Sequence, residues 1–297
     1  MTTFSYWVMA IRPRTLPAAI APLLLGNVLA YSHDSFSWAI ALSAMLCGLL
    51  LQIGVNLAND YFDFKSGIDT DARLGPTRVT QSGLLTPQAV RNAMALSLLA
   101  AVLVGFYLIA VGGWPVVWMA LAAVAGALGY SGGPYPLASH GLGEVAAFLF
   151  FGLLAVVGVY FIQTGDAPLL VWLLAATVGL LNAAIMLVNN TRDIRTDAQA
   201  GKRTVAVRIG LGGARHLYRV LITLPFFILS LIWLLGLLPG EAMLLSVIAA
   251  PMALRLIQDF YRVDGPALNP LLGRTAGLTM MFGILLSLGT LWAHLAA

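Results

Sequence analysis

The sequence predicts an all-α polytopic membrane protein whose nine transmembrane helices form one bundle. Three observations lead to this fold class. Of the 297 residues, 60% are hydrophobic and only 9% are charged, whereas a soluble domain carries about 25% charged residues. The mean hydropathy is +0.90. The apolar residues also form continuous runs, whereas the strands of a membrane β-barrel alternate apolar and polar residues.

A helix that crosses the hydrocarbon core needs about 20 predominantly apolar residues. The runs of this kind are, in chain order, Leu16–Ser32, Phe36–Ala58, Asn92–Val111, Trp114–Tyr130, Leu142–Ile162, Ala167–Val188, Leu217–Leu237, Glu241–Tyr261 and Ala276–Leu295. Pro17 and Pro22 favour a kink in the first run, and Arg255 interrupts the eighth. We expect a single domain, residues 1–297, with related halves of about 1–140 and 141–297.

The basic residues indicate how the helices are oriented. Alternating the nine spans places the N-terminus on one side, together with the connections 59–91, 131–141, 189–216 and 262–275. All 16 Lys and Arg lie on this side or near the helix ends that face it. By the positive-inside rule this side is cytoplasmic. We therefore expect a multi-pass protein of a bacterial cytoplasmic (inner) membrane, with its N-terminus inside, its C-terminus outside and its active site near the cytoplasmic face. The net charge of +4 then gives no reason to expect a nucleic-acid partner.

The cysteine and the histidines suggest neither a disulfide nor a zinc site. Cys47 is the single cysteine and lies inside an apolar run, where a buried structural role is expected. The four histidines show no ligand spacing. The N-terminal residues lack a small-residue cleavage site after a short apolar core, so no cleaved signal peptide is expected.

Two acidic motifs end two of the predicted spans. Asn59 precedes Asp63 by four positions, and Asn189 precedes Asp193 by four, with Asp197 four further on. A spacing of four places side chains on one face of a helix. The second copy follows the first by 130 positions, which is a weak internal repeat typical of a bundle built from two halves.

The first copy carries additional polar side chains. Asn56 and Asp60 fall within the same arc of about 100° as Asn59 and Asp63, at about 100° per residue. The next acids, Asp69 and Asp71, follow Gly67, near which we expect the helix to break. Asp71 is more typical of a solvated loop.

Carboxylates clustered at membrane depth repel one another and are costly to desolvate, and a divalent cation relieves both penalties. Oxygen ligands without histidine or thiolate favour Mg²⁺, which is usually completed by substrate phosphates. Bases near the two motifs are candidates for binding a diphosphate, although positive-inside anchoring would explain any one of them alone. The candidate bases are Lys65, Arg73, Arg78, Lys202 and Arg203.

A diphosphate head on Mg²⁺ and a hydrocarbon tail among apolar helices would fit such a site. Departure of an allylic diphosphate leaves a carbocation, which must be shielded from water and captured by an electron-rich acceptor. The uncharged connection before Glu144 contains Tyr130, Tyr135 and His140, which are candidates for binding a flat phenolic acceptor. Glu144 is a candidate for orienting or deprotonating its hydroxyl. The alternative is a Gly-Pro turn with interfacial aromatics, followed by an acid that the helix dipole favours.

The paired motifs resemble those of the UbiA superfamily of intramembrane aromatic prenyltransferases, and most closely its branch that prenylates 1,4-dihydroxy-2-naphthoate. The matching segments are RPRTLPAAIAPLLLG (12–26), QIGVNLANDYFDFKSGIDTDARLGPTR (52–78), YSGGPYPLASHGLGE (130–144), NNTRDIRTDAQAGKRTVAVRIG (189–210) and LNPLLGRT (268–275). The resemblance implies a nine-helix bundle, Mg²⁺ dependence, a polyprenyl diphosphate donor and an aromatic acid acceptor. It further implies loss of the acceptor's carboxyl group, giving demethylmenaquinol in menaquinone biosynthesis.

The resemblance also assigns roles to residues. The implied metal ligands are Asn59, Asp63, Asp69, Asn189, Asp193 and Asp197. Asp69 takes its role because Gly67 stands where other branches of the superfamily have the last Asp of the first motif. The candidate catalytic residues are Asp60, Asp63, Asp193 and Glu144, and Asn56 joins Tyr130, Tyr135, His140 and Glu144 as candidates for binding the acceptor.

Three other functions are compatible with parts of the pattern. One is prenylation of another acceptor, such as 4-hydroxybenzoate. A CDP-alcohol phosphotransferase also uses membrane acids and a metal, but in one continuous DxxD…DxxxD array. A cation transporter is expected to have its acids near the bilayer midplane in broken helices, whereas these acids cluster at one face.

Overall fold

The computed structural model describes residues 2–67 and 74–296, and over these residues it contains helices and no β-strand. The predicted all-α class is therefore confirmed. The elements are α1 (Thr3–Ile11), η1 (Pro13–Thr15), α2 (Pro17–Tyr31), α3 (Trp38–Lys65), α4 (Pro87–Gly112), α5 (Trp114–Gly129), η2 (Leu137–Ser139), α6 (Gly143–Phe148), η3 (Leu149–Leu154), α7 (Ala155–Thr164), α8 (Leu169–Arg192), α9 (Ile194–Gln199), α10 (Val205–Leu234), α11 (Gly240–Val247), α12 (Ala250–Arg262), η4 (Gly265–Leu268) and α13 (Asn269–Ala296).

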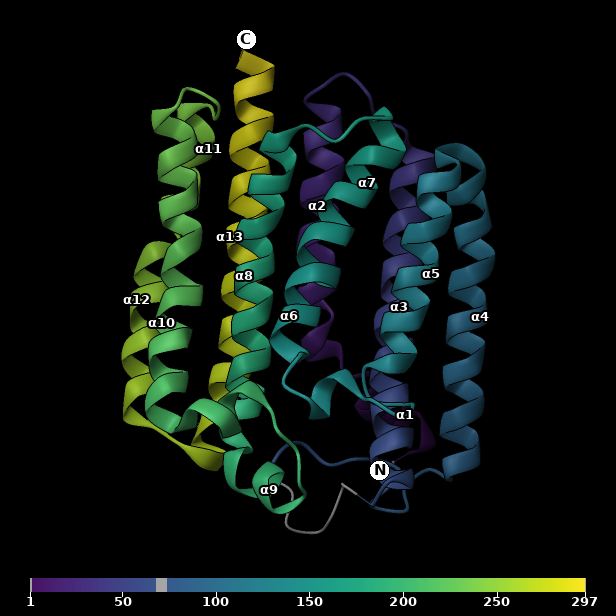
Figure 1. Ribbon diagram of the computed structural model, residues 1–297. Coiled ribbons are helices and arrows are strands. Elements are labelled where there is room, and N and C mark those ends of the chain that lie inside the picture. The colour runs from purple at the N-terminus through teal and green to yellow at the C-terminus, as the bar shows by residue number, and fades with distance from the viewer. Residues whose placement is uncertain (1, 68–73, 297) are drawn as a thin grey trace.

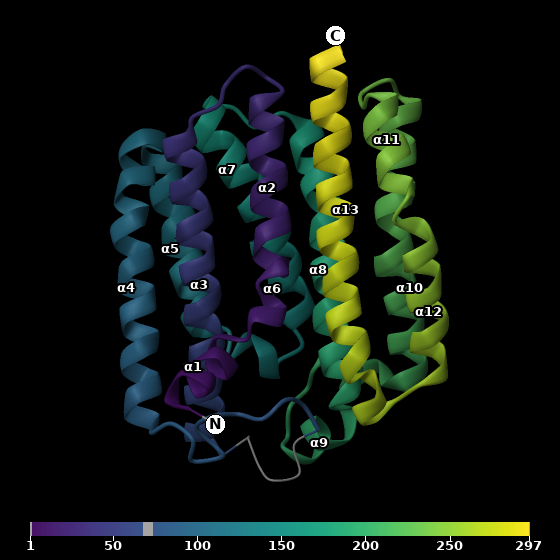
Figure 2. The ribbon, with the colours of Figure 1, turned by 180° about the vertical axis from the view of Figure 1, so that it is seen from behind.

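The long helices run side by side between two ends of the bundle (Figure 1). The N-terminus, α1 and α9 lie at one end, and the C-terminus lies at the other. Seen from both sides, α3, α4 and α5 form one edge and α10, α11 and α12 form the opposite edge, with α2, α6, α8 and α13 between them (Figure 2). We call the end that carries α9 the α9 end.

Seven described helical stretches are long and apolar enough to cross a membrane, and the bent pair Thr3–Thr15 and Pro17–Tyr31 makes an eighth if it is one span. Helix α5 overlaps the fourth predicted span but has only 16 residues, fewer than the about 20 that a spanning helix needs. The chain is thus a membrane protein by its helices, but the predicted number of nine spans is not confirmed. The prediction of one domain with two related halves stays a prediction.

Proline explains two of the bends. The segments Thr3–Thr15 and Pro17–Tyr31 are bent by 52° relative to each other. Pro13 and Pro17 each begin a helical segment, and Arg12, just before Pro13, has a φ of 55°. The eighth predicted span divides into α11 and α12 at Ile248–Ala249, just before Pro251, whereas Arg255 lies within the continuous helix α12.

The span that contains α6 and α7 passes through a π-helical segment, η3, which packs tightly on α8. A Cβ atom on Gly152 would lie 2.4 Å from the Cα of Gly179, so the two backbones are in direct contact. On the next turn of α8, Asn182 donates a hydrogen bond to the Phe151 carbonyl at 3.4 Å. Such π segments leave carbonyls outside the regular ladder and often occur at functional sites.

The two acidic motifs end their helices differently. Helix α3 continues seven residues past Ala58 to Lys65, and Gly67 follows with a φ of 69°, so the expected break near Gly67 is confirmed. Helix α8 instead ends at Arg192, and Asp193 has non-helical backbone angles (φ −97°, ψ 10°) before α9 begins. The prediction that Asn189, Asp193 and Asp197 lie on one helical stripe is therefore wrong, because the helix breaks at Asp193.

Candidate active site

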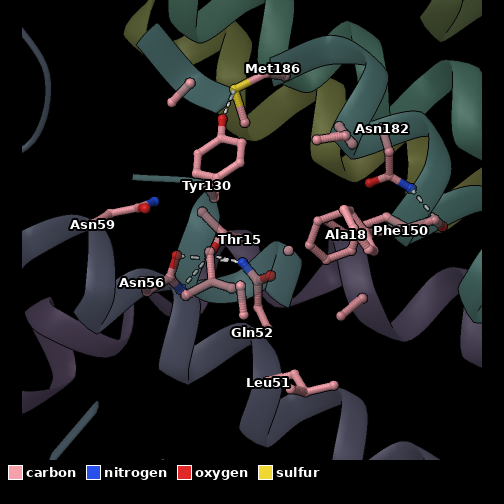
Figure 3. A pocket seen from close by; sticks show the side chains of 18 of the residues that line it. Thr15, Ala18, Leu51, Gln52, Asn56, Asn59, Tyr130, Phe150, Asn182 and Met186 are labelled. Atoms are coloured by element: carbon pink, nitrogen blue, oxygen red, sulfur yellow. Dashed lines mark hydrogen bonds between the residues drawn. The ribbon is translucent and has the colours of Figure 1, made fainter. Parts of the chain in front are cut away.

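One large cavity of about 690 Å³ opens within the bundle, and both acidic motifs line its polar part. Asn59 and Asp63 reach it from α3, and Asn189 and Asp193 reach it from the end of α8. Figure 3 shows Asn56, Asn59 and Tyr130 around the same space as Asn182 and Met186. Segments 130 positions apart in the sequence thus meet at one site.

The first motif is held by partners from three segments. Asp63 is buried and forms a salt bridge of 2.8 Å with the guanidinium of Arg78, which is also buried. Asn59 Oδ1 accepts a short hydrogen bond from the Ser131 hydroxyl. Asn56 Nδ2 donates to the Ile11 carbonyl at 2.7 Å. These bonds fix the end of α3 against the turn after α1 and the connection after α5.

Asp60 has a different environment from its neighbours. It is 1% exposed and does not line the cavity. Its carboxylate accepts hydrogen bonds from the backbone N–H groups of Val79 at 3.3 Å and Thr80 at 3.0 Å, with Arg12 at 4.0 Å. This geometry anchors the connection between α3 and α4, and the catalytic role given to Asp60 stays a prediction.

The second motif is organised by Arg192, whose side chain is 2% exposed. Its guanidinium donates to both carboxylate oxygens of Asp193, at 2.8 and 2.6 Å, and to Asn189 Oδ1 at 2.9 Å. It also donates to Asn269 Oδ1 at 2.9 Å, and Asn269 in turn donates to the Leu74 carbonyl. Arg192 therefore ties the second motif to the start of α13 and to the connection that follows the first motif.

Asp197 completes the acids of the second motif. It is buried at the cavity wall, and its carboxylate lies 3.5 Å from the ammonium group of Lys202. The backbone N–H of Lys202 donates to the Asp197 carbonyl at 2.9 Å. The short turn after α9 thus places the ammonium group of Lys202 beside the carboxylate of Asp197.

The five candidate diphosphate-binding bases fall into three groups. Arg78 and Lys202 line the cavity. Lys65 and Arg203 are exposed and do not line it. Arg73, like the candidate metal ligand Asp69, lies outside the residues that the structure describes.

The candidate acceptor-binding residues are divided as well. Asn56 and Tyr130 line the cavity, whereas Tyr135 and His140 do not. Those two rings stack on each other with centroids 3.6 Å apart. Tyr130 donates to the Met186 sulfur at 2.9 Å. Burial raises the pKa of Tyr130 above its ordinary value, and the charge of Glu144 raises it further, so this hydroxyl is a neutral donor at physiological pH.

Glu144 lies just behind the cavity wall. It is 5% exposed, and its Oε1 accepts a hydrogen bond of 2.9 Å from Asn190, which does line the cavity. Its Oε2 is buried and has no hydrogen-bond partner among the described residues. Asn190 is thus the side chain through which Glu144 contacts the site.

Sequence reasoning missed several polar residues of this wall. Gln52 Nε2 donates to Thr15 Oγ1 at 3.3 Å, and Asn56 Nδ2 donates to the same oxygen at 3.0 Å (Figure 3). Arg12 also lines the cavity. The signal was present, because Gln52 precedes Asn56 by four positions and Arg12 and Thr15 open one of the matching segments.

Away from the acids the cavity becomes apolar. On α3 its lining runs from Asp63 back to Ala44, a length of about 28 Å at 1.5 Å per residue. Leu108, Val116 and Ile162 line the far part. This length is that of the whole cavity, head region included, and is close to the thickness of the hydrocarbon core of a membrane. The apolar part, from Leu51 to Ala44, covers about 10 Å of α3.

The donors of the head region suit a hard divalent ion. Carboxylate and amide oxygens of Asn59, Asp63, Asn189, Asp193 and Asp197 line the polar part, and oxygen donors of this kind are those that Mg²⁺ prefers. Within residues 2–67 and 74–296, no three His, Cys, Asp or Glu side chains converge as a metal cluster. Each of the three carboxylates instead contacts a basic side chain, whose place a cation would take.

Comparison with known proteins places the chain among prenyltransferases. The model of the UbiA prenyltransferase family matches residues 19–272. A protein of Mycobacterium tuberculosis named 1,4-dihydroxy-2-naphthoate octaprenyltransferase is 37% identical, with 98% of each chain covered. A protein of Escherichia coli with the same name is 34% identical, covering 98% of this chain and 96% of the relative.

A solved structure shares the fold. A UbiA homologue from Archaeoglobus fulgidus, bound to DMAPP and Mg²⁺, superposes with a TM-score of 0.65 at 14% identity, covering 95% of this chain and 99% of the homologue. At this identity the likeness concerns the fold alone.

Proposed function

The chain belongs to the UbiA prenyltransferase family, and from this premise we propose that it transfers a polyprenyl group from a polyprenyl diphosphate to 1,4-dihydroxy-2-naphthoate. It is a membrane-bound transferase. In the proposed reaction the acceptor loses its carboxyl group and becomes demethylmenaquinol, a step of menaquinone biosynthesis. The observation that carries the proposal is that both acidic motifs line the polar part of one cavity whose far part is mainly apolar.

The head region has the charges that a diphosphate requires. Asn59, Asp63, Asn189, Asp193 and Asp197 would hold Mg²⁺, which when bound stabilises the negative charge that develops on the leaving diphosphate. Arg78 and Lys202 line the same region and would bind the diphosphate oxygens directly. Their ion pairs with Asp63 and Asp197 place both cations beside the acids that would hold the metal.

The apolar channel would bind the polyprenyl tail and keep water from the allylic cation. Its walls are mostly Ala, Gly, Leu, Val, Ile and Phe, and Cys47 and Met119 also line it. A polar head region joined to an apolar channel supports a donor with a charged head and a long hydrocarbon tail.

The acceptor would lie between Tyr130 and Asn56, with Asn190 and Glu144 on the adjoining wall. When the ring carbon that carries the carboxylate attacks the allylic carbon, the C–O bond to diphosphate breaks and a C–C bond forms. The carboxylate then leaves as CO₂, and its bonding electron pair restores the aromatic ring. No ring C–H proton has to be removed, so Glu144 needs only to orient a hydroxyl through Asn190.

The proposed location is a bacterial cytoplasmic membrane with the N-terminus and the acidic motifs on the cytoplasmic side. Two observations support it. The N- and C-termini lie at opposite ends of the bundle (Figure 1), and the relatives from Mycobacterium tuberculosis and Escherichia coli are bacterial.

The test is an assay of the purified protein with a radiolabelled allylic diphosphate and a panel of aromatic acids, with and without EDTA. We expect prenylation of 1,4-dihydroxy-2-naphthoate, release of CO₂ and loss of activity on chelation, restored by Mg²⁺. Preference for 4-hydroxybenzoate would reject the proposed acceptor, and prenylation that survives full chelation would reject the metal role.

A further inference from the structure

A second, smaller depression lies on the outer side of the bundle, between α10 and α12. It has a volume of about 350 Å³ and is lined by Arg219, Ile257, Gln258, Tyr261 and Arg262. None of these residues lines the candidate active site. Helices α10 and α12 form one edge of the bundle (Figures 1 and 2), and Tyr261 and Arg262 are the last residues of α12, near the α9 end. We call this depression the α10–α12 groove.

The groove is positively charged and uncompensated. No ion pair or hydrogen bond among the described residues engages the guanidinium of Arg219 or of Arg262, and both residues are exposed. Arg215 and His216 stand beside the Tyr261 ring, at 6.0 and 6.2 Å from its centroid. Cations without an ion-pair partner, here Arg219 and Arg262, raise the local affinity for an anion, whereas Arg215 donates to the Val263 carbonyl at 3.4 Å.

Two acids lie near these cations in the sequence, and neither forms an ion pair with Arg219 or Arg262 among the described residues. Asp259 is held by Arg274 at 2.6 Å, and no ion pair among the described residues engages Asp264. The groove therefore keeps the charge of Arg219 and Arg262 available to a ligand.

Two buried polar atoms next to the groove also lack partners. The Tyr261 hydroxyl and Arg215 Nε are inaccessible to solvent, and neither has a hydrogen-bond partner among the described residues. A buried donor without a partner costs free energy. Because both atoms are inaccessible, a ligand in the groove would contact the exposed guanidinium groups of Arg219 and Arg262 instead.

An apolar strip leads away from the cations along α10. Val220, Leu224, Phe227 and Leu231 are spaced by four, three and four positions, and they are 37–69% exposed. Leu254 on α12 is 58% exposed. Because α10 and α12 both belong to stretches that can cross a membrane, this strip would face hydrocarbon, with the arginines at its headgroup end.

From this juxtaposition we propose that the α10–α12 groove binds the phosphate of an anionic phospholipid, whose acyl chains lie on the apolar strip of α10. Basic depressions between membrane helices are suited to such headgroups. The same cations would accept a free phosphate, but a free phosphate would make no use of the strip. The site is separate from the candidate active site and does not depend on the proposed reaction.

The test is native mass spectrometry of the purified full-length protein, titrated with phosphatidylglycerol, phosphatidylcholine or inorganic phosphate. We expect one tightly held phosphatidylglycerol per chain and much weaker phosphatidylcholine, whose choline offsets the phosphate charge. Arg219→Gln combined with Arg262→Gln should weaken that binding roughly tenfold or more, because two charge-assisted contacts are lost. Glutamine retains side-chain length, and circular dichroism would verify that the variant is folded.

The matched control is Arg91→Gln, which removes an exposed arginine from the first turns of α4, on the other edge of the bundle. This variant should retain the bound phosphatidylglycerol. Equal binding by the double variant, or equal binding of phosphatidylcholine, would overturn the proposal.

If inorganic phosphate displaces phosphatidylglycerol at similar concentrations, the groove is a phosphate site and the lipid assignment fails. A double variant that does not fold would be replaced by Arg219→Lys with Arg262→Lys, which should retain phosphatidylglycerol over phosphatidylcholine, and loss of that preference would count against the charge argument.

Discussion

At the scale of single residues, the candidate site is a set of acids that are each already paired with a base. Asp63 contacts Arg78, Asp193 contacts Arg192, and Asp197 contacts Lys202. Such pairing makes buried acids tolerable before substrate binds. Because of this pairing, replacing one acid or one base changes the substrate site and also leaves the opposite charge without its partner.

Asp63→Asn and Asp193→Asn are each expected to lower turnover more than about tenfold, a loss of at least ~1.4 kcal/mol of transition-state stabilisation. Asparagine fills nearly the same volume, so the protein should remain folded. Steady-state kinetics of the purified variants would measure the loss. Asp259→Asn, which breaks a partly exposed ion pair outside the cavity, should retain activity, and a similar loss there would make the assignment unspecific.

Asp60→Ala is expected to lower stability rather than to act on the chemistry directly. It would leave the buried N–H groups of Val79 and Thr80 without their acceptor, at a cost of about 1–3 kcal/mol. Thermal unfolding should shift to lower temperature, and Asp60→Asn, which keeps one acceptor oxygen, should lose less. An unchanged unfolding temperature together with lost turnover would favour the catalytic role instead.

At the scale of elements, the contact between η3 and α8 depends on having no side chain at Gly152. A Cβ there would lie 2.4 Å from the Gly179 backbone, a distance that real Cβ atoms do not adopt. Gly152→Ala should therefore force α8 away, disturb the cavity wall at Phe151 and Asn182, and lower the unfolding temperature by several degrees.

The matched control is Gly273→Ala in α13, where a Cβ would meet nothing within 4 Å. Alanine has the better helix propensity by up to about 1 kcal/mol, so this variant should be as stable as the parent or more so. Parallel thermal unfolding of the two variants compares them, and equal shifts would contradict the close-packing argument.

The elements also show what sequence reasoning can and cannot provide. Periodicity located the helix that carries Asn59 and Asp63, because apolar runs and a spacing of four are local properties. It missed the break at Asp193, because that break accompanies a hydrogen bond from Arg192 to Asn269, a residue 77 positions away. It likewise grouped Asp60 with the cavity acids, although the backbone of Val79 and Thr80 draws its carboxylate elsewhere.

The three aromatic candidates take different positions in the structure. Tyr130, Tyr135 and His140 lie in one short connection, and composition alone treats them alike. In the structure Tyr130 turns into the cavity while Tyr135 and His140 stack on each other outside it. Which side of a connection faces a cavity is decided by the helices around it, and the sequence of the connection does not contain that information.

At the scale of the whole molecule, the two acidic motifs and the longer connections lie at the α9 end. Orientation can be tested because Cys47 is the single cysteine. In a Cys47→Ser background, Gln88→Cys places an exposed thiol at the start of α4, and Asp166→Cys places one at the opposite end of the bundle. In intact cells, an impermeant maleimide should label position 166 and leave position 88 unlabelled.

After the cells are broken, position 88 should become labelled as well, which verifies that its thiol is reactive. Labelling of position 88 but not position 166 in intact cells would reverse the proposed orientation. The outcome bears on the side of the membrane at which the acidic motifs lie, and leaves the chemistry of the cavity untouched.

The apolar channel that runs along α3 from Leu51 to Ala44 has a consequence for kinetics. A donor whose tail occupies this channel moves from the lipid bilayer into the protein without dissolving in water. Encounters between enzyme and donor then happen in two dimensions, and their frequency follows the number of donor molecules per unit of bilayer. Adding inert lipid to vesicles that hold fixed amounts of enzyme and donor would slow turnover, because it lowers the number of donor molecules per unit of membrane area.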